Sequence, residues 1–299
     1  MAFRDIALAV LVAALWGFNF VVIKEGLDTF PPLFFSALRF LSAAFPAVLF
    51  LRRGTIAWST LLKVGIVLGV VKYSLLYLGV KLGMPAGLSS LAIQSQVIFT
   101  AVLSAYVLKD APSAWQRVGM GVALSGILLL ASTRQGSVSR EGFALVIGAA
   151  MAWSVANILI KKAAVDTFRL MVWMSVVPPL PLLVLSFLFE QGQWEALPRL
   201  GTFKGLGAVL YTGLLATIVA FGIWGHLFRK YSPNVVAPFA LLVPVFGMAS
   251  SMLVLGERLS GMHVAAALLV LAGLVLVVLG KRLPGLGRAP AVPHPLTKG

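Results

Sequence analysis

Two basic side chains lie within stretches of otherwise apolar or small residues. Arg39 occurs in SALRFLSAAF, and Lys72 occurs in an apolar stretch that also contains Tyr73 and Tyr77. A guanidinium can hold a carboxylate through two parallel hydrogen bonds. The two tyrosines are four residues apart and share one face of a helix. Lys72 is too central in its stretch to reach water easily, so it is predicted to point into a cavity and to bind substrate.

Arg39 has two interpretations. It could bind an anionic group of a substrate, or it could pair with a carboxylate such as Glu25 or Asp28 at the end of the preceding helix. The sequence favours the pairing, because these acids are near in sequence and buried arginines are often held by such partners.

Tryptophan and asparagine form two similar pairs in the two halves of the chain. Trp16 and Asn19 are three residues apart, and Trp153 and Asn157 are four apart, so each pair can share a helix face. A cavity lined by these residues would suit a zwitterion, with rings for its side chain and its ammonium. The alternative is that the asparagines join helices and the tryptophans lie at the membrane interface.

Further polar or ring-bearing residues interrupt apolar segments and are candidates for the same site. Gln94 is the first choice within the polar triplet Gln94-Ser95-Gln96, because three consecutive polar residues cannot all face lipid. The other substrate-binding candidates are Tyr211 and Trp224.

Three residues are candidates for motion or coupling. His226 is the one histidine expected to titrate in a helix near a cavity. Pro238 and Pro244 free backbone carbonyls one turn earlier and could bend a helix, as hinges or simply in packing.

Several chemistries are missing from the sequence. There is no cysteine, the three histidines are far apart, and no GxxxxGK[ST] loop is present, so no metal site, no ATP and no cofactor are expected. The nine acidic residues all lie near predicted helix ends or in loops. No carboxylate is therefore expected in mid-membrane to exchange a proton, so any transport by such a chain would be facilitated rather than proton-coupled.

The elements that must position these residues are membrane helices. The chain is 60% hydrophobic and 11% charged, with a mean hydropathy of +1.00, whereas soluble domains carry about 25% charged residues. Ten apolar blocks approach the length of about 20 residues that spans a bilayer. They are 6–24, 33–51, 61–81, 86–108, 117–133, 142–160, 171–189, 205–228, 234–255 and 262–280.

The basic residues predict the orientation. With ten helices, 15 Lys and Arg lie on the side that carries both termini, 7 lie on the other side, and Arg39 and Lys72 lie inside helices, which accounts for all 24. The excess predicts that both termini are cytoplasmic. The net charge of +15 is scattered between apolar blocks, so no nucleic-acid partner is expected.

The two halves resemble each other. The segment 108–113 aligns with 255–260, and at the same offset Gly126 aligns with Gly273. We therefore predict an all-α polytopic membrane protein built from two five-helix repeats, 1–133 and 142–280, with a linker at 134–141 and a disordered cytoplasmic tail at 281–299. An odd number of helices per repeat inverts the second repeat, as in secondary transporters that work by alternating access.

Three stretches carry a family resemblance. They are LWGFNFVVIKEGLDTFPPLFFSALRF (15–40), GMPAGLSSLAIQSQVIFTAVLSAYVLKD (83–110) and APFALLVPVFGMASSMLVLGERLSG (237–261). Together they resemble the EamA family of the drug/metabolite transporter superfamily, and the likeness covers essentially residues 1–280. It is greatest to bacterial exporters of cysteine and O-acetylserine and of aromatic amino acids. The resemblance implies export of amino acids or related small metabolites across the bacterial inner (plasma) membrane.

Two other functions remain as alternatives. A multidrug or organic-cation exporter is disfavoured because Arg39 and Lys72 would repel cations. An intramembrane enzyme would need a nucleophile with a base, or metal ligands, on facing helices, and the sequence offers neither. The sequence does not determine the oligomeric state, and a monomer is compatible with it.

Overall fold

A computed structural model of the chain describes residues 1–132 and 138–280, and within these residues every regular element is helical. Nine helical segments are long and apolar enough to cross a membrane, and a tenth forms if the bent pair Thr167–Met174 and Pro179–Phe189 is one span. This agrees with the predicted ten blocks. The predicted tail (281–299) and half of the predicted linker (134–137) lie outside the described residues.

The first half contains five spans. They are α1 (Phe3–Leu27); α2 (Pro32–Ala44) with α3 (Ala47–Phe50); α4 (Trp58–Val64), the π-helix η1 (Gly65–Lys72) and α5 (Tyr73–Lys81); α6 (Ala86–Ala92), the 3-10 turn η2 (Ile93–Ser95) and α7 (Gln96–Val107); and α8 (Ala114–Ser132).

The second half contains the remaining spans and two short segments. They are α9 (Arg140–Ala163); α10 (Thr167–Met174) with α11 (Pro179–Phe189); the short α12 (Gln193–Ala196) and η3 (Leu197–Gly201); α13 (Phe203–Leu210), the π-helix η4 (Tyr211–Val219) and α14 (Ala220–Lys230); α15 (Pro233–Val236), the 3-10 turn η5 (Ala237–Leu241) and α16 (Leu242–Leu255); and α17 (Gly261–Leu279).

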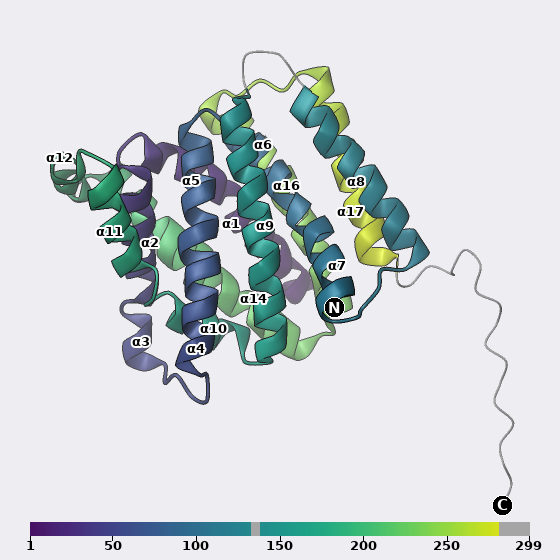
Figure 1. The fold of residues 1–299 in the computed structure, drawn as a ribbon, viewed down its shortest axis with the longest axis horizontal. Helices are drawn as coiled ribbons and strands as arrows, with labels where there is room; N and C mark the ends of the chain where they lie inside the picture. The colour runs from purple at the N-terminus through teal and green to yellow at the C-terminus, as the bar shows by residue number, and fades with distance from the viewer. Residues whose placement is uncertain (133–137, 281–299) are drawn as a thin grey trace, which may run out of the picture.

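The spans form one bundle in which the first and second halves are interleaved (Figure 1). α9 packs between α5 and α7, α1 packs against α16 and α14, and α8 packs along α17. The last contact is close because it is lined by glycines: a Cβ on Gly126 would lie 2.8 Å from the Ala266 carbonyl oxygen, and one on Gly119 would lie 2.7 Å from that of Gly273. Small residues of this kind let membrane helices approach each other.

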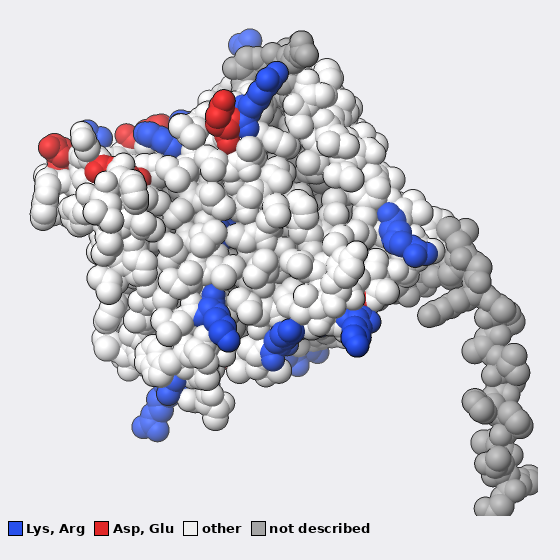
Figure 2. Space-filling model, in the orientation of Figure 1, with Lys and Arg blue, Asp and Glu red and all other residues white. Residues whose placement is uncertain are grey.

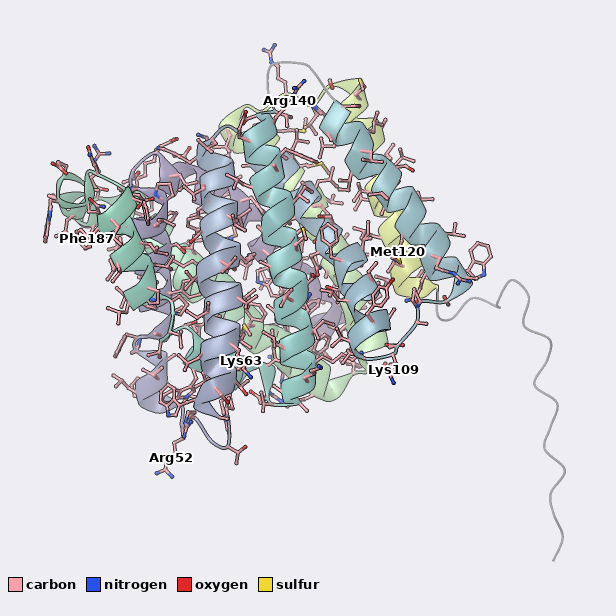
Figure 3. All side chains as sticks on the ribbon, in the orientation of Figure 1. Arg52, Lys63, Lys109, Met120, Arg140 and Phe187 are labelled. Carbon is pink, nitrogen blue, oxygen red and sulfur yellow. The ribbon has the colours of Figure 1, made fainter. Side chains whose placement is uncertain are left out.

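Charge separates the bundle into two ends and an uncharged belt. Figure 2 shows Lys and Arg at both ends of the visible face and Asp and Glu almost all at its upper end, with an almost uncharged surface between the two ends. Arg52, Lys63 and Lys109 lie at the end that carries the N-terminus, and Arg140 lies at the opposite end (Figure 3). We call these the N-terminal end and the far end. An uncharged belt of this kind fits the hydrocarbon layer of a membrane.

Four spans are interrupted in matching places of the two halves. The third and eighth spans each contain a π-helix, η1 and η4, and the fourth and ninth each contain a 3-10 turn, η2 and η5. Pro238 lies in η5, and Pro244 is buried within α16. The predicted seventh helix, 171–189, is broken at 175–178, where Pro178 and Pro179 cannot continue the backbone hydrogen bonds.

Candidate functional site

Arg39 on α2 is buried in the middle of the bundle, with 2% of its surface exposed. Its Nη2 atom donates to Tyr73 Oη (2.9 Å) and to Thr217 Oγ1 (3.0 Å), and Nη1 donates to Tyr77 Oη (3.4 Å). The tyrosines come from α5 and the threonine from η4, so two other spans hold the guanidinium. Three hydroxyl partners fix its orientation without neutralising its charge.

The predicted pairing of Arg39 with Glu25 or Asp28 is wrong. Glu25 pairs with Lys204 (2.6 Å), and Asp28 pairs with Lys24 (3.3 Å). The reason is distance along the helix. Arg39 lies seven residues after the first residue of α2, which is roughly 10 Å at 1.5 Å per residue, whereas both acids lie at the bundle end beyond that helix start.

Lys72, the last residue of η1, is also buried, with 4% of its surface exposed. Its Nζ atom lies 3.4 Å from the ring centroid of Tyr73 and 4.7 Å from that of Trp153 on α9. The Tyr73 ring also faces Arg39, whose Cζ atom lies 3.9 Å from the same centroid. Two cations therefore meet around one tyrosine.

A small cavity of about 30 Å³ lies between these groups. We call it the cationic cavity. Its ten lining residues come from both halves of the chain and are Arg39, Phe40, Leu68, Lys72, Tyr73, Trp153, Met171, Met174, Thr217 and Phe221. Two carry a positive charge and none carries a negative one. In addition, Arg39 Nε is buried and finds no hydrogen-bond acceptor among the described residues.

A second cavity of about 250 Å³ lies at the N-terminal end of the bundle, where α7, the start of α8 and the last turn of α17 meet. We call it the amide cavity. It is lined by Gln96, Val97, Thr100, Ala101, Ser104, Asp110, Pro112, Gln116 and Val277. Asn157 Nδ2 on α9 donates to Gln96 Oε1 (2.8 Å) and Thr100 Oγ1 (3.2 Å), both at this cavity. Asp110 pairs with Lys161 (3.4 Å).

The predicted Trp153–Asn157 pair is divided between the two cavities. Trp153 lines the cationic cavity, whereas Asn157, one helical turn further along α9, bonds to Gln96 and Thr100 at the amide cavity. Because residues four apart on a helix are neighbours, α9 connects the two cavities through one turn.

The equivalent pair in α1 lines neither cavity. Trp16 Nε1 donates to the Ala216 carbonyl oxygen (2.9 Å), and its ring packs 5.1 Å from that of Phe221. Trp16 thus supports the cationic cavity from behind. Asn19 is buried, and its Oδ1 atom has no hydrogen-bond donor among the described residues.

Four more predicted residues lie outside both linings. Tyr211 Oη donates to the Leu15 carbonyl oxygen (3.0 Å), and the ring of Trp224 packs 5.2 Å from that of Trp16. Gln94 is buried in η2. His226 is exposed on α14, so its expected position near a cavity is wrong: the helix turns it away from the side on which Thr217 and Phe221 lie.

Sequence reasoning missed most of the residues that line these cavities, and three of them are instructive. Thr217 and Phe221 are four residues apart in an apolar span, and that spacing could have placed them on one face. Of the two glutamines in the polar triplet, Gln96 lines a cavity and Gln94 does not. The 3-10 turn at Ile93–Ser95 changes which member of the polar triplet faces α9, and no pattern in the sequence marks that turn.

In the described part of the chain, nine apolar spans and one bent helix pair surround a buried cationic cavity, which is an architecture typical of a polytopic membrane transporter. The chain matches the EamA-like transporter family twice, over residues 4–132 and 140–279, and belongs to that family. Since this family consists of transporters, the alternative of an intramembrane enzyme is set aside.

Relatives agree over nearly the whole length. The chain is 40% identical over 291 residues to a probable amino-acid metabolite efflux pump of Salmonella typhimurium, covering 94% of this chain and 97% of the relative. It is 38% identical to a protein of the same description from Escherichia coli, with the same coverage. An uncharacterized inner membrane transporter of Escherichia coli, YedA, is 25% identical and covers 90% of this chain.

A solved crystal structure has the same fold. It covers 95% of this chain and 99% of its own chain, with a TM-score of 0.69 and 17% identity, so the likeness concerns the fold alone. Together with the candidate spans, these relatives support a multi-pass location in the inner membrane.

Proposed function

We propose that this protein exports amino-acid-derived metabolites and that the cationic cavity binds their carboxylate group. One observation carries the proposal: Arg39 and Lys72 are both buried at one cavity whose lining contains no carboxylate. A charge in mid-membrane costs at least ~2.5–3.5 kcal/mol. An anionic ligand would offset that cost for both cations at once.

The geometry suits carboxylate recognition. The hydroxyls of Tyr73, Tyr77 and Thr217 hold the guanidinium in place, which reduces the ordering needed when a ligand binds. The remaining walls include Met171 and Met174, whose flexible side chains adapt to different ligand shapes. Efflux of amino-acid metabolites, the activity that the names of the relatives give, uses ligands of this kind.

The cavity of about 30 Å³ holds about one water molecule, and pockets for small-molecule ligands are usually about 300–1,000 Å³. Binding must therefore widen it. The four interrupted spans provide places where the bundle can bend, since π-helices and 3-10 turns often mark functional hinges. Their matching positions, with the double family match, support two inverted repeats and alternating access.

At the far end of the bundle, two carboxylates of the second half bind backbone N–H groups of the first half and hold the two halves together. Glu257 accepts hydrogen bonds from the backbone N–H groups of Ala86 (2.6 Å) and Gly87 (3.0 Å) at the start of α6. Glu190 accepts from those of Leu33 (2.8 Å) and Phe34 (3.2 Å) at the start of α2. The amide cavity lies at the other end, beside Asp110.

We therefore assign this conformation to a state closed toward the periplasm, with the amide cavity as a cytoplasmic entrance. The count of basic residues supports this orientation, since both termini are then cytoplasmic. A fluorescent protein fused to the C-terminus should be bright and alkaline phosphatase at the same place inactive. The reverse result contradicts the orientation.

Transport should follow the gradient of the substrate itself, because no carboxylate lines the cationic cavity to exchange a proton. The test uses proteoliposomes loaded with radiolabelled amino acids and their acylated derivatives. Efflux of at least one should exceed that from empty liposomes and continue when the proton gradient is collapsed. Concentrative movement driven by a pH gradient alone would contradict facilitated export.

The organic-cation alternative is disfavoured by the same lining. A cation in this cavity would meet Arg39 and Lys72 with no acidic group to offset the repulsion. Faster efflux of an organic cation than of any carboxylate in the same liposomes would reverse this choice.

A further inference from the structure

We infer that the preferred substrates carry a carboxylate but no free ammonium group, as N-acylated amino acids do. This inference rests on the proposed function and narrows it. An ordinary amino acid is a zwitterion at neutral pH, so its site must satisfy two opposite charges. The cationic cavity offers groups for only one of them.

The lining has no anionic acceptor for an ammonium. Its only polar uncharged side chains are the hydroxyls of Tyr73 and Thr217 and the indole of Trp153, which is a donor only. Both hydroxyl oxygens already accept hydrogen bonds from Arg39 Nη2. Each oxygen keeps at most one further lone pair, so these two neutral acceptors could not satisfy the three N–H donors of an ammonium.

Aromatic faces, the other way to hold an ammonium, are largely taken by the protein's own cations. Lys72 Nζ faces Tyr73 and Trp153, at 3.4 and 4.7 Å from their centroids. Arg39 Cζ lies 5.4 Å from the centroid of Phe40. Of the four rings in the lining, only Phe221 carries no such contact. A substrate ammonium would have to displace a resident cation and would be repelled by both.

The remaining surface is apolar and suits a neutral substituent. Leu68, Met171 and Met174 are buried apolar residues of the lining. An acyl group on the nitrogen removes its charge and adds apolar surface that these side chains can cover. The same reasoning admits acids with a neutral hydroxyl or keto group in place of the amine.

The test compares matched pairs in proteoliposomes of the full chain. The probes are radiolabelled leucine, phenylalanine and methionine, each against its N-acetyl derivative, with leucinamide as a probe that keeps the ammonium and lacks the carboxylate. We expect the N-acetyl form to move at least about tenfold faster than the free amino acid, since one unfavourable charge contact alone changes affinity by about that factor. Leucinamide should not move above the level of empty liposomes.

The outcomes separate this inference from the proposed function. Free amino acids moving as fast as their N-acetyl forms, or faster, would overturn the inference and leave carboxylate export standing. If leucinamide moves and no carboxylate does, both fall. If no probe moves above empty liposomes while thermal denaturation shows a folded protein, both fall as well.

A designed carboxylate gives a second test. Leu68→Glu places an acid in the lining, and Lys63→Glu places one at the exposed end of the same span as a control. The first variant should shift the ratio of N-acetyl to free amino-acid flux toward the free form by about tenfold or more, and the second should leave it unchanged. Met174→Glu repeats the test from α10 if Leu68→Glu does not fold. An unchanged ratio in folded cavity variants contradicts the inference.

Discussion

The two cavities of this bundle satisfy their polar groups in opposite ways, although α9 contacts both: Trp153 lines one, and Asn157, one helical turn further along, bonds to lining residues of the other. In the amide cavity, Gln96, Thr100 and Asn157 bond to one another, and Asp110 pairs with Lys161. In the cationic cavity, Arg39 and Lys72 have hydroxyls and rings around them but no counter-charge. The polar groups named in the amide cavity therefore bond to one another without a ligand. The cationic cavity is left with a charge that a ligand can neutralise, and this difference is the basis on which we propose the cationic cavity as the binding site and the amide cavity as an entrance.

The largest effect should follow from loss of the guanidinium charge. Arg39→Gln keeps an amide donor for the surrounding hydroxyls and removes the ion pair with substrate. Hydrogen bonds to charged groups contribute about 1.5–3 kcal/mol each, so losing two should lower substrate flux at least ~100-fold. Arg39→Lys keeps the charge without the planar fork and should lose about tenfold.

The control for this prediction is Arg52→Gln, which removes the same charge at the exposed N-terminal end. Flux is measured in proteoliposomes and folding by thermal denaturation. Because Arg39 has no carboxylate partner within residues 1–132 and 138–280, the variant should remain monodisperse. An Arg39→Gln protein that transports normally would remove the contrast between the two cavities.

Lys72→Gln is expected to have the second largest effect. Flux should fall about tenfold or more through a higher KM, since one charge contact with the carboxylate is lost. Thermal stability should be unchanged or slightly higher, because a buried charge without a counter-ion is removed. Lys63→Gln, in the same span but exposed, serves as the control. A strong loss of stability in Lys72→Gln would assign Lys72 to the structure of the bundle instead.

Much of this arrangement was predictable from hydropathy. The ten apolar blocks correspond to the nine spans and the bent pair, because lipid imposes length and apolarity on any spanning helix. Arg39, Lys72, Tyr73, Tyr77 and Trp153 were all expected at a buried site, and the structure brings them together. Charges in such spans stand out because they are costly there.

Other features could not be predicted, for physical reasons. The π-helices and 3-10 turns differ from α-helix only in hydrogen-bond register, which leaves hydropathy unchanged, yet they decide which side chains face inward. The 3-10 turn η2 is the reason why Gln96 could not be predicted, whereas the spacing of Thr217 and Phe221 could have indicated that they share a face. The predicted pairing of Arg39 with Glu25 or Asp28 is wrong because these residues, although near in sequence, lie at different depths of the bundle.

A smaller effect is expected for Thr217→Val, which preserves the shape of the side chain and removes one acceptor from Arg39. A hydrogen bond to a charged group contributes about 1.5–3 kcal/mol, but Arg39 keeps its bonds to Tyr73 and Tyr77, so only part of this acts on substrate binding. KM should therefore rise severalfold while kcat changes less. Thr100→Val, the equivalent change in the amide cavity, is the comparison. Equal effects of the two substitutions would mean that the cavities do not differ as described.

The smallest effect is expected for Asn157→Leu, which removes the amide that bonds to Gln96 and Thr100 at the amide cavity. Gln96 Oε1 still accepts from Thr100 Oγ1 (3.3 Å) after the amide is removed. Stability should fall by about 1 kcal/mol, and flux should change less than about threefold. Kinetic constants and thermal denaturation of the purified variant measure both. A loss of flux comparable to that of Arg39→Gln would make the amide cavity part of the substrate site.

The most direct measurement is a structure of the protein with its best-transported carboxylate bound. The account predicts a cationic cavity wider than about 30 Å³, with the carboxylate of the ligand within hydrogen-bond distance of the Arg39 guanidinium or the Lys72 ammonium. A carboxylate held at Gln96 and Asn157, with both cations still facing only hydroxyls and rings, would contradict it.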